Sequence, residues 1–155
     1  MIELEADLFT STAPALGHGV NTHGVMGAGI AVVVRASFPG LFERYVEECS
    51  SGRLTPGKVH VFVPPHDWPT PQRAVFNMAT QDRPGPYATL LWVRQAAGAA
   101  LALADSYGFD RVAIPRIGCG IGGLRWNAVR TVLVGVERRH SAQFEVFDWK
   151  PRRRA

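Results

Sequence analysis

Four glycines lie within six positions, 118 to 123, between an apolar run that ends at Pro115 and a helical segment that begins near Arg125. Glycine loses more conformational freedom on folding than any other residue, so such a cluster is costly unless the backbone needs the space. At a strand-to-helix turn, unpaired backbone N–H groups bind anions, and glycine lets a phosphate approach without a Cβ in the way. The run therefore predicts a phosphate-binding loop.

A second loop, residues 21–31, has the same context and contains Gly27 and Gly29. In α/β proteins, ligands bind beyond the carboxyl ends of the strands, so two such loops would close on a diphosphate from both sides. The P-loop is excluded because the chain has no GxxxxGK[ST] motif. A dinucleotide-binding Rossmann motif is excluded because no strand and acidic residue follow the loop at residues 118–123 at about 20 positions.

Strand-like and helix-like segments alternate along the chain, which predicts an α/β layer fold with a largely parallel, buried sheet. The 155 residues fit one domain, expected at residues 1–149, with a basic tail at 150–155. We expect strands at residues 2–6, 15–20, 59–63, 74–78, 111–115 and 143–147, and helices at 27–35, 41–49, 89–107 and 125–139.

The net charge of +4 comes from the C-terminal end, where Lys150, Arg152, Arg153 and Arg154 lie. Without these four, 13 basic and 13 acidic residues remain, so the body of the chain carries no basic signature of nucleic-acid binding. The tail is interpreted as a solvated terminus.

The two cysteines, Cys49 and Cys119, form no CxxC motif, and the five histidines form no cluster with metal-ligand spacing. We expect two free thiols in a reducing compartment, no metal and no cofactor. No apolar run approaches the roughly 20 residues that span a bilayer, and the acidic N-terminus is unlike a signal peptide. The expectation is a cytoplasmic monomer with no membrane partner.

Three motifs occur in the order that the macrodomain family shows: Asp7-Leu8-Phe9, the loop that runs through Met26-Gly27-Ala28-Gly29-Ile30-Ala31, and Pro-Arg-Ile-Gly-Cys-Gly from Pro115 to Gly120. The chain resembles most the branch with the terminal ADP-ribose protein glycohydrolase and the antitoxins that reverse DNA ADP-ribosylation. The resemblance covers residues 2–149. It implies a three-layer α/β/α sandwich with a mixed, largely parallel central sheet. Its implied partner is ADP-ribose or an ADP-ribosylated protein, with ADP-ribosylated nucleic acid as the alternative.

The resemblance also implies ligand-binding roles. Asp7 would accept a hydrogen bond from the adenine amino group, supported by the Leu8 amide, and Phe147 or Trp149 would pack near adenine. Asn21 would face the distal ribose. The two loops would wrap the diphosphate and the distal ribose through Gly27, Gly29 and Ile30 on one side and Arg116, Ile117, Gly118, Cys119, Gly120, Ile121 and Gly122 on the other.

The catalytic pair of the related glycohydrolases is missing. Those enzymes use a lysine after the strand that matches residues 74–78 and an aspartate in the glycine loop that matches residues 118–123. Here residues 77–83 hold no lysine, and Gly122 stands at the aspartate position. We therefore expect a non-lysine hydrolase that removes ADP-ribose from acidic side chains, with water activated by a substrate phosphate oxygen. The candidates for positioning this water are Asn21, Thr80, Gln81 and Asp82.

Three alternatives stay open. In the first alternative, the chain is a reader module that binds ADP-ribose without cleaving it, since its binding loops remain and the catalytic pair is absent. Alternatively, it is a phosphatase that acts on ADP-ribose phosphate, an activity also known in this branch. In the third alternative, Cys119 is a nucleophile whose pKa the neighbouring amides lower.

Overall fold

The protein's structure, a computed structural model, describes residues 1–65 and 73–148. The described residues form one six-stranded sheet with the strand order β1-β6-β5-β2-β4-β3. Neighbouring strands are parallel except β3 and β4, which are antiparallel. The elements in chain order are β1 (Ile2–Leu4), a 3-10 turn η1 (Leu8–Thr10), β2 (Ala15–Val20), α1 (Ile30–Ser37), α2 (Leu41–Ser50), β3 (Val59–Phe62), β4 (Ala74–Ala79), α3 (Leu90–Tyr107), β5 (Arg111–Pro115), α4 (Trp126–Glu137) and β6 (Gln143–Phe147).

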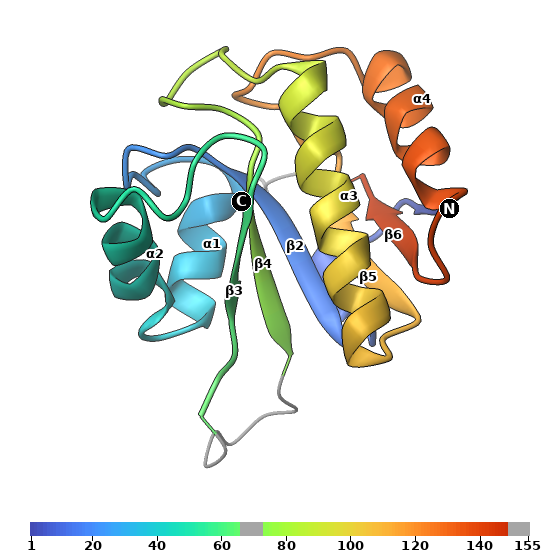
Figure 1. The fold of residues 1–155 in the computed structure, drawn as a ribbon, viewed down its shortest axis with the longest axis horizontal. Helices are drawn as coiled ribbons and strands as arrows, with labels where there is room; N and C mark the ends of the chain where they lie inside the picture. Colours follow the sequence, from blue (N-terminus) through green and yellow to red (C-terminus); the bar gives the residue numbers. More distant parts are fainter. Residues whose placement is uncertain (66–72, 149–155) are drawn as a thin grey trace, which may run out of the picture.

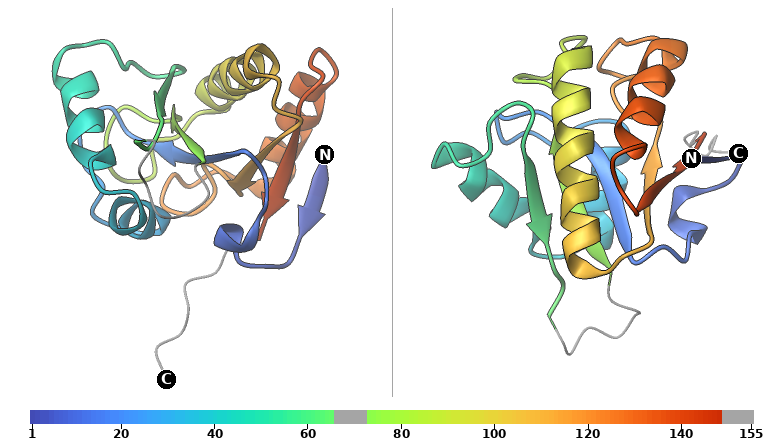
Figure 2. Two further views of the ribbon diagram at one scale, coloured as in Figure 1. Left: turned by 90° about the horizontal axis from the view of Figure 1, so that it is seen from below. Right: turned by 45° about the vertical axis from the view of Figure 1, so that its right-hand side comes forward.

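Helices cover both faces of the sheet, with α1 and α2 on one side and α3 and α4 on the other (Figures 1 and 2). Side chains along a strand point alternately to opposite faces, so each strand contributes to two cores. In β4, Val75 and Ala79 pack beneath α1 and α2, whereas Phe76 and Met78 pack beneath α3 and α4. The predicted three-layer sandwich with a mixed, largely parallel sheet is confirmed.

Local chemistry explains the bounds of the longest helix, α3. The Thr89 side chain accepts a hydrogen bond from the Trp92 amide at the N-terminus, and Gly108 adopts the left-handed conformation that ends the helix. Alanines line the buried side of α3, so the helix lies close to the sheet. The predicted bounds, Thr89 to Tyr107, differ from the structure by the capping residue alone.

Among the boundaries that differ from the prediction, two have a clear local cause. The helix expected from Gly27 begins at Ile30, because Gly29 has φ 61° and ψ −146°, which no helix accommodates. The glycine loop after β2 is therefore longer than expected, and more of its amides stay outside the helix. The first strand ends at Leu4 rather than Ala6, since Asp7 caps the turn η1 through the Phe9 amide.

The carboxyl ends of β2, β4 and β5 meet at one edge of the sheet, and the loops that follow these strands gather there (Figure 1). The loops span residues 21–29, 80–89 and 116–125. In the described ranges, no helix is long and apolar enough to cross a membrane.

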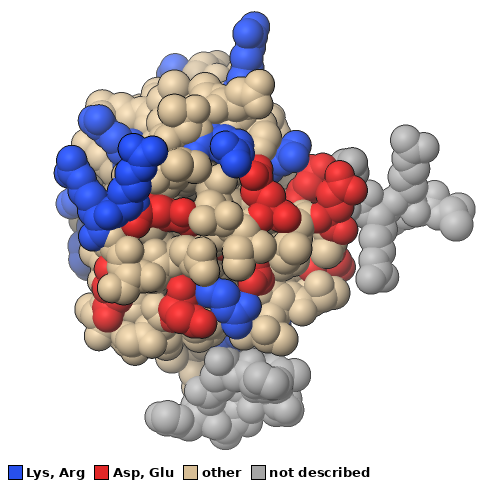
Figure 3. Space-filling view, turned by 90° about the vertical axis from the view of Figure 1, so that its right-hand side faces the viewer, with Lys and Arg blue, Asp and Glu red and all other residues tan. Residues whose placement is uncertain are grey.

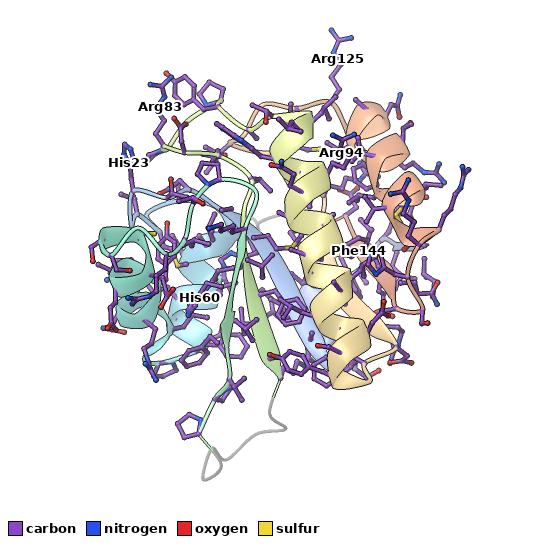
Figure 4. The ribbon with its side chains drawn as sticks, in the orientation of Figure 1. His23, His60, Arg83, Arg94, Arg125 and Phe144 are labelled. Carbon is purple, nitrogen blue, oxygen red and sulfur yellow. The ribbon has the colours of Figure 1, made fainter. Side chains whose placement is uncertain are left out.

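A row of polar side chains crosses three strands on the face covered by α1 and α2. His18 on β2 lies 2.6 Å (Nε2 to Oδ1) from Asn77 on β4, and the Asn77 amide nitrogen lies 3.1 Å from Nδ1 of His60 on β3. Figure 4 shows His60 at the outer end of this row. Because Asn77 Oδ1 only accepts, Nε2 of His18 donates and its Nδ1 is unprotonated. Among the described residues, this buried Nδ1 has no hydrogen-bond partner.

Protonation of His18 is expected to destabilise the fold in acid. Burial lowers the pKa of His18 from 6.5 to about 4, although its hydrogen bond to Asn77 acts in the opposite direction. Between these pH values the unfolded chain binds a proton that the folded chain does not. Stability is therefore full above pH 6.5 and falls by about 3 kcal/mol as the pH drops to 4.

Urea unfolding at pH 7 and pH 4.5 measures this loss, and His18→Gln is the control. Glutamine retains a donor for Asn77 but does not titrate, so the variant should lose clearly less stability than the wild type over the same interval. Burial also lowers the pKa of His60, whose contribution is present in both proteins. An equal acid loss in both proteins would show that His18 is not the responsible group.

Candidate functional site

A cavity of about 540 Å³ opens at the carboxyl ends of the central strands. It exists because β2 and β5 separate: their ladder holds two residue pairs, Ala15 with Val112 and Leu16 with Ala113, whereas β2 pairs with β4 over all six residues. Gly19 and Val20 line the cavity on the β2 side and Pro115 on the β5 side. The volume lies in the usual range for a small-molecule site.

The loop after β2 is held by its own asparagine. The Asn21 Oδ1 atom accepts from the amides of His23 (3.0 Å) and Val25 (3.4 Å), and its Nδ2 donates to the Val25 carbonyl (2.8 Å). The buried Tyr45 hydroxyl also donates to Asn21, to the main-chain oxygen at 2.7 Å and to Oδ1 at 3.0 Å. Asn21 lines the cavity, but its oxygen is already occupied by the loop that it shapes.

The loop after β5 folds into consecutive tight turns. The Leu124 amide donates to the Gly118 carbonyl (2.8 Å), and the Gly123 amide donates to the Gly120 carbonyl (3.3 Å). Gly118 and Gly123 have φ of 74° and 82°, which side-chain-bearing residues rarely adopt. The two glycine loops meet across the cavity, since a Cβ on Gly29 would lie 3.3 Å from Cδ1 of Ile121.

The loop after β4 forms a third wall that joins the other two. Thr22 donates to the Asp82 carbonyl through its amide and its hydroxyl, and the Ala88 amide donates to the Gly122 carbonyl. Gln81 Nε2 donates to the carbonyls of Arg83 (2.7 Å) and Gly85 (3.2 Å). Figure 4 shows Arg83 at this end of the molecule, on the same side as His23 of the first loop.

Most of the predicted site residues come together at this cavity. The lining residues that the sequence predicted are Asn21, Gly27, Gly29, Ile30, Thr80, Gln81, Arg116, Ile117, Gly118, Gly120, Ile121 and Gly122. Gly19, Val20, Val25 and Pro84 also line the cavity and were not predicted as site residues. The proline-rich segment around Pro84 is the one sequence signal that could have indicated such a residue.

Five predicted residues are not among the described residues that line the cavity: Asp7, Leu8, Cys119, Asp82 and Phe147. Asp7 caps η1, while the Leu8 side chain is wholly buried in the core. The Asp82 carboxylate, whose side chain is 43% exposed, lies 3.9 Å from Arg83 on the outside of the loop. Trp149 lies outside the described residues, and its neighbour Phe147 is buried in the core.

Cys119 has the environment of a protonated thiol. Its Sγ lies 3.5 Å from the Ile117 carbonyl, to which the thiol donates. Burial raises the pKa of Cys119 to about 11, although Arg116 acts in the opposite direction. A nucleophilic cysteine requires a lowered pKa, so this environment argues against a thiolate mechanism.

Arg116 is the single charged residue among the described residues that line the cavity. The remaining groups are backbone amides, apolar side chains and the neutral polar side chains of Asn21, Thr80 and Gln81. Within the described ranges, no group of three or more histidine, cysteine or acidic residues is placed to hold a metal ion. The cavity can bind an extended anion through amides and can orient water through neutral side chains, but none of the described residues that line it supplies a carboxylate as a base.

Comparison with known proteins gives consistent matches. DNA ADP-ribosyl glycohydrolases of Thermus aquaticus and Mycobacterium tuberculosis are 28% and 30% identical to the chain over 128 residues, which cover 82% and 83% of it. The chain spans about a third of the length of these relatives, 35% and 36%. An ADP-ribose 1''-phosphate phosphatase of Candida albicans is 25% identical over 150 residues, covering 88% of the chain and 94% of that protein.

Among solved structures, the macrodomain of Mycobacterium tuberculosis DarG superposes with a TM-score of 0.83 and 26% identity, covering 96% of this chain and 97% of that one. The family model described as Macro domain matches residues 18–133, which contain the end of β2, all of β4 and β5, and both glycine loops. The chain therefore belongs to the macro domain family.

Proposed function

We propose that the chain binds ADP-ribose in this cavity and hydrolyses the bond between the distal ribose and an acidic side chain, using water and no lysine. The observation that carries the proposal is the cavity between the two glycine loops, at the point where strands β2 and β5 separate. The names of the DNA ADP-ribosyl glycohydrolases that the chain resembles support the reaction class. A monomer in the cytoplasm is part of the proposal, which agrees with the free thiols of Cys49 and Cys119.

The strand order suggests how the ligand lies. Asp7, the expected adenine partner, follows β1 at the outer edge of the sheet, beyond β6 and β5. Gln81 and Pro84 follow β4 at the opposite end of the cavity. We therefore place the distal ribose near Gln81, the diphosphate between the loops over β2 and β5, and the adenosine beyond Arg116.

Gln81 is the residue best placed to orient the attacking water. Its Nε2 is held by the carbonyls of Arg83 and Gly85, so Oε1 points the other way. This Oε1 lies 3.1 Å from the position of a Cβ on the lining residue Gly122, and it is available to accept a hydrogen bond from water in the cavity. Thr80, another lining residue, is 1% exposed and lies beneath the ligand path.

The reaction needs no strong protein base. ADP-ribose esters of carboxylates are activated acetals, and their cleavage passes through an oxocarbenium-like transition state. The water oxygen bonds to the anomeric carbon as the bond to the ester oxygen breaks, and the electron pair leaves with the carboxylate. The water proton passes to a phosphate oxygen of the substrate. Positioning then supplies much of the rate.

Close packing around Gly122 leaves no room for a carboxylate side chain at the position where related enzymes have an aspartate. A Cβ at this position would lie 2.7 Å from the Gly118 carbonyl oxygen and 2.8 Å from the Ala88 Cβ. Both neighbours are backbone or short side chains that cannot swing away. An aspartate at position 122 would therefore displace the loop that forms the anion site.

ADP-ribosylated DNA is the second candidate substrate, favoured by the names of the glycohydrolases that the chain resembles. The side of the molecule that carries α4 shows basic and acidic side chains next to one another (Figure 3). Arg130 of α4, for example, pairs with Glu3 of β1 at 3.0 Å. Because this surface is mixed in sign, it adds no support for a DNA-binding face, and the assay below presents both substrates.

Binding is tested by calorimetry with ADP-ribose, for which we expect a Kd of about micromolar. Gly120→Glu should abolish binding without unfolding the protein, because a Cβ on Gly120 meets nothing within 4 Å and an added carboxylate repels the diphosphate. Gly135→Glu is the matched control, since Gly135 lies on α4 away from the cavity and is equally open. Absence of heat with the wild type at high micromolar protein would overturn the proposed function.

Hydrolysis is tested by release of label from a Glu-linked ADP-ribosylated protein and from ADP-ribosylated DNA. We expect Gln81→Ala to lower the rate roughly tenfold to a hundredfold, because the water loses its orientation. Asp82→Asn and Cys119→Ser should leave the rate unchanged, as neither residue is among the described lining residues.

Each alternative has its own outcome in this assay. Label that stays bound at equimolar protein supports the reader module. Release of phosphate from ADP-ribose 1''-phosphate alone supports a phosphatase, the activity in the name of the Candida albicans relative. A loss of rate with Asp82→Asn but not with Gln81→Ala would contradict the role of Gln81 and would indicate that the Asp82 carboxylate is the base.

The packing at Gly122 is tested by stability. Gly122→Ala should lower the unfolding free energy by about 1–3 kcal/mol through overpacking, which corresponds to a Tm decrease of roughly 2–4 °C for each kcal/mol. Gly120→Ala is the control in the same loop, where the added methyl group meets nothing within 4 Å. Equal melting temperatures for the two variants would contradict the tight contact between Gly122 and Gly118.

A further inference from the structure

Arg116 has surroundings that differ from those of a phosphate-binding arginine. Its guanidinium carbon lies 5.1 Å from the ring centroid of Trp126, and NH1 lies 3.7 Å from Oδ1 of Asp148. Trp126 is the first residue of α4, and Asp148 directly follows β6. Two elements therefore hold the side chain on the β6 side of the cavity.

The free surface of Arg116 decides what it can contact. The side chain is 41% exposed and lines the cavity, so a ligand in the cavity can reach the guanidinium. An arginine stacked on one aromatic ring presents a planar surface on which a second ring can stack. Its charge is already partly balanced by Asp148, whose side chain is 22% exposed.

The strand order places a nucleobase at this point. Pro115 pairs with Phe147, so Arg116 and Asp148 leave the sheet side by side. Arg116 follows β5, two strands along the sheet from β4, and Asp148 follows β6, one strand further, so the separated strands of the cavity lie between Gln81 and this point and leave space for the distal ribose and the diphosphate. The next part of the ligand is the adenosine.

We propose that Arg116, supported by Trp126 and Asp148, is the stacking platform for the adenine ring, and does not itself bind the diphosphate. This inference rests on the proposed binding of ADP-ribose. It assigns the diphosphate to the backbone amides of the glycine loops and the nucleobase to a layered arrangement of Trp126, guanidinium and adenine. Arg116 is thereby the residue that makes the site select a nucleotide over a simple anion.

The test compares ADP-ribose with inorganic pyrophosphate, which has no base, by calorimetry and by NMR titration. Arg116→Ala should weaken ADP-ribose binding about tenfold, the size expected for one stacking contact. Arg116→Lys should weaken it as much, because lysine keeps the charge but not the planar face. Pyrophosphate binding should stay within about twofold of wild type in both variants. Arg94→Ala, which removes an exposed arginine from α3 outside the cavity, is the control for net charge (Figure 4).

The outcomes separate this inference from the proposed function. Two results together would overturn the platform and make Arg116 a phosphate contact. The Arg116→Lys variant would bind ADP-ribose as tightly as the wild type does, and Arg116→Ala would weaken pyrophosphate binding as much as it weakens ADP-ribose binding. No wild-type binding of ADP-ribose would overturn the proposed function and the platform with it. Trp126→Leu adds an independent check, because it removes the supporting ring while Arg116 stays and should weaken ADP-ribose but not pyrophosphate.

Discussion

The early end of the hydrogen-bond ladder between β2 and β5 is the constraint on which the site depends. After Leu16 and Ala113 the two central strands separate, and the cavity opens where a continuous sheet would have paired backbone with backbone. A parallel sheet tolerates such a gap at its centre when neighbouring ladders and both helical layers hold the strands in place. Here β2 remains paired with β4 along its whole length, and β5 with β6 over five residue pairs.

Binding and chemistry use different parts of the molecule. The glycine loops supply amides whose positions are held by bonds within and between loops, such as those from Leu124 to Gly118 and from Ala88 to Gly122. The same bonds make the loop around Gly122 too close-packed for a carboxylate. The proposed chemistry consequently depends on neutral groups of the third loop, above all Gln81, and on the substrate's own phosphate.

The sequence predicted strand bounds correctly where an apolar run is followed directly by a polar or charged residue. The strands Ala15–Val20, Arg111–Pro115 and Gln143–Phe147 have the predicted bounds. The helix after the first loop was predicted three residues too early, because the decisive fact is the backbone angle at Gly29. Asp82 and Cys119 lie beside site residues in sequence, yet they are not among the described residues that line the cavity, because a loop exposes neighbouring side chains to different surroundings. The prediction for Trp149 falls outside the described residues.

The sequence alone determined the layered α/β class, the macro domain family and the two glycine loops, because these follow from local periodicity and from motifs that are contiguous in the chain. It also determined that no lysine is present at the expected catalytic position. Only the tertiary structure decided which groups face one another. It showed that the Asn21 oxygen is occupied by its own loop, that burial raises the pKa of Cys119, that Gly122 has no room for a side chain, and that Arg116 lies against Trp126 and Asp148. Several of these contacts join residues far apart in the chain, such as Arg116 with Asp148 and Gly122 with Ala88, and the local ones depend on how each loop folds, so no spacing in the sequence encodes them.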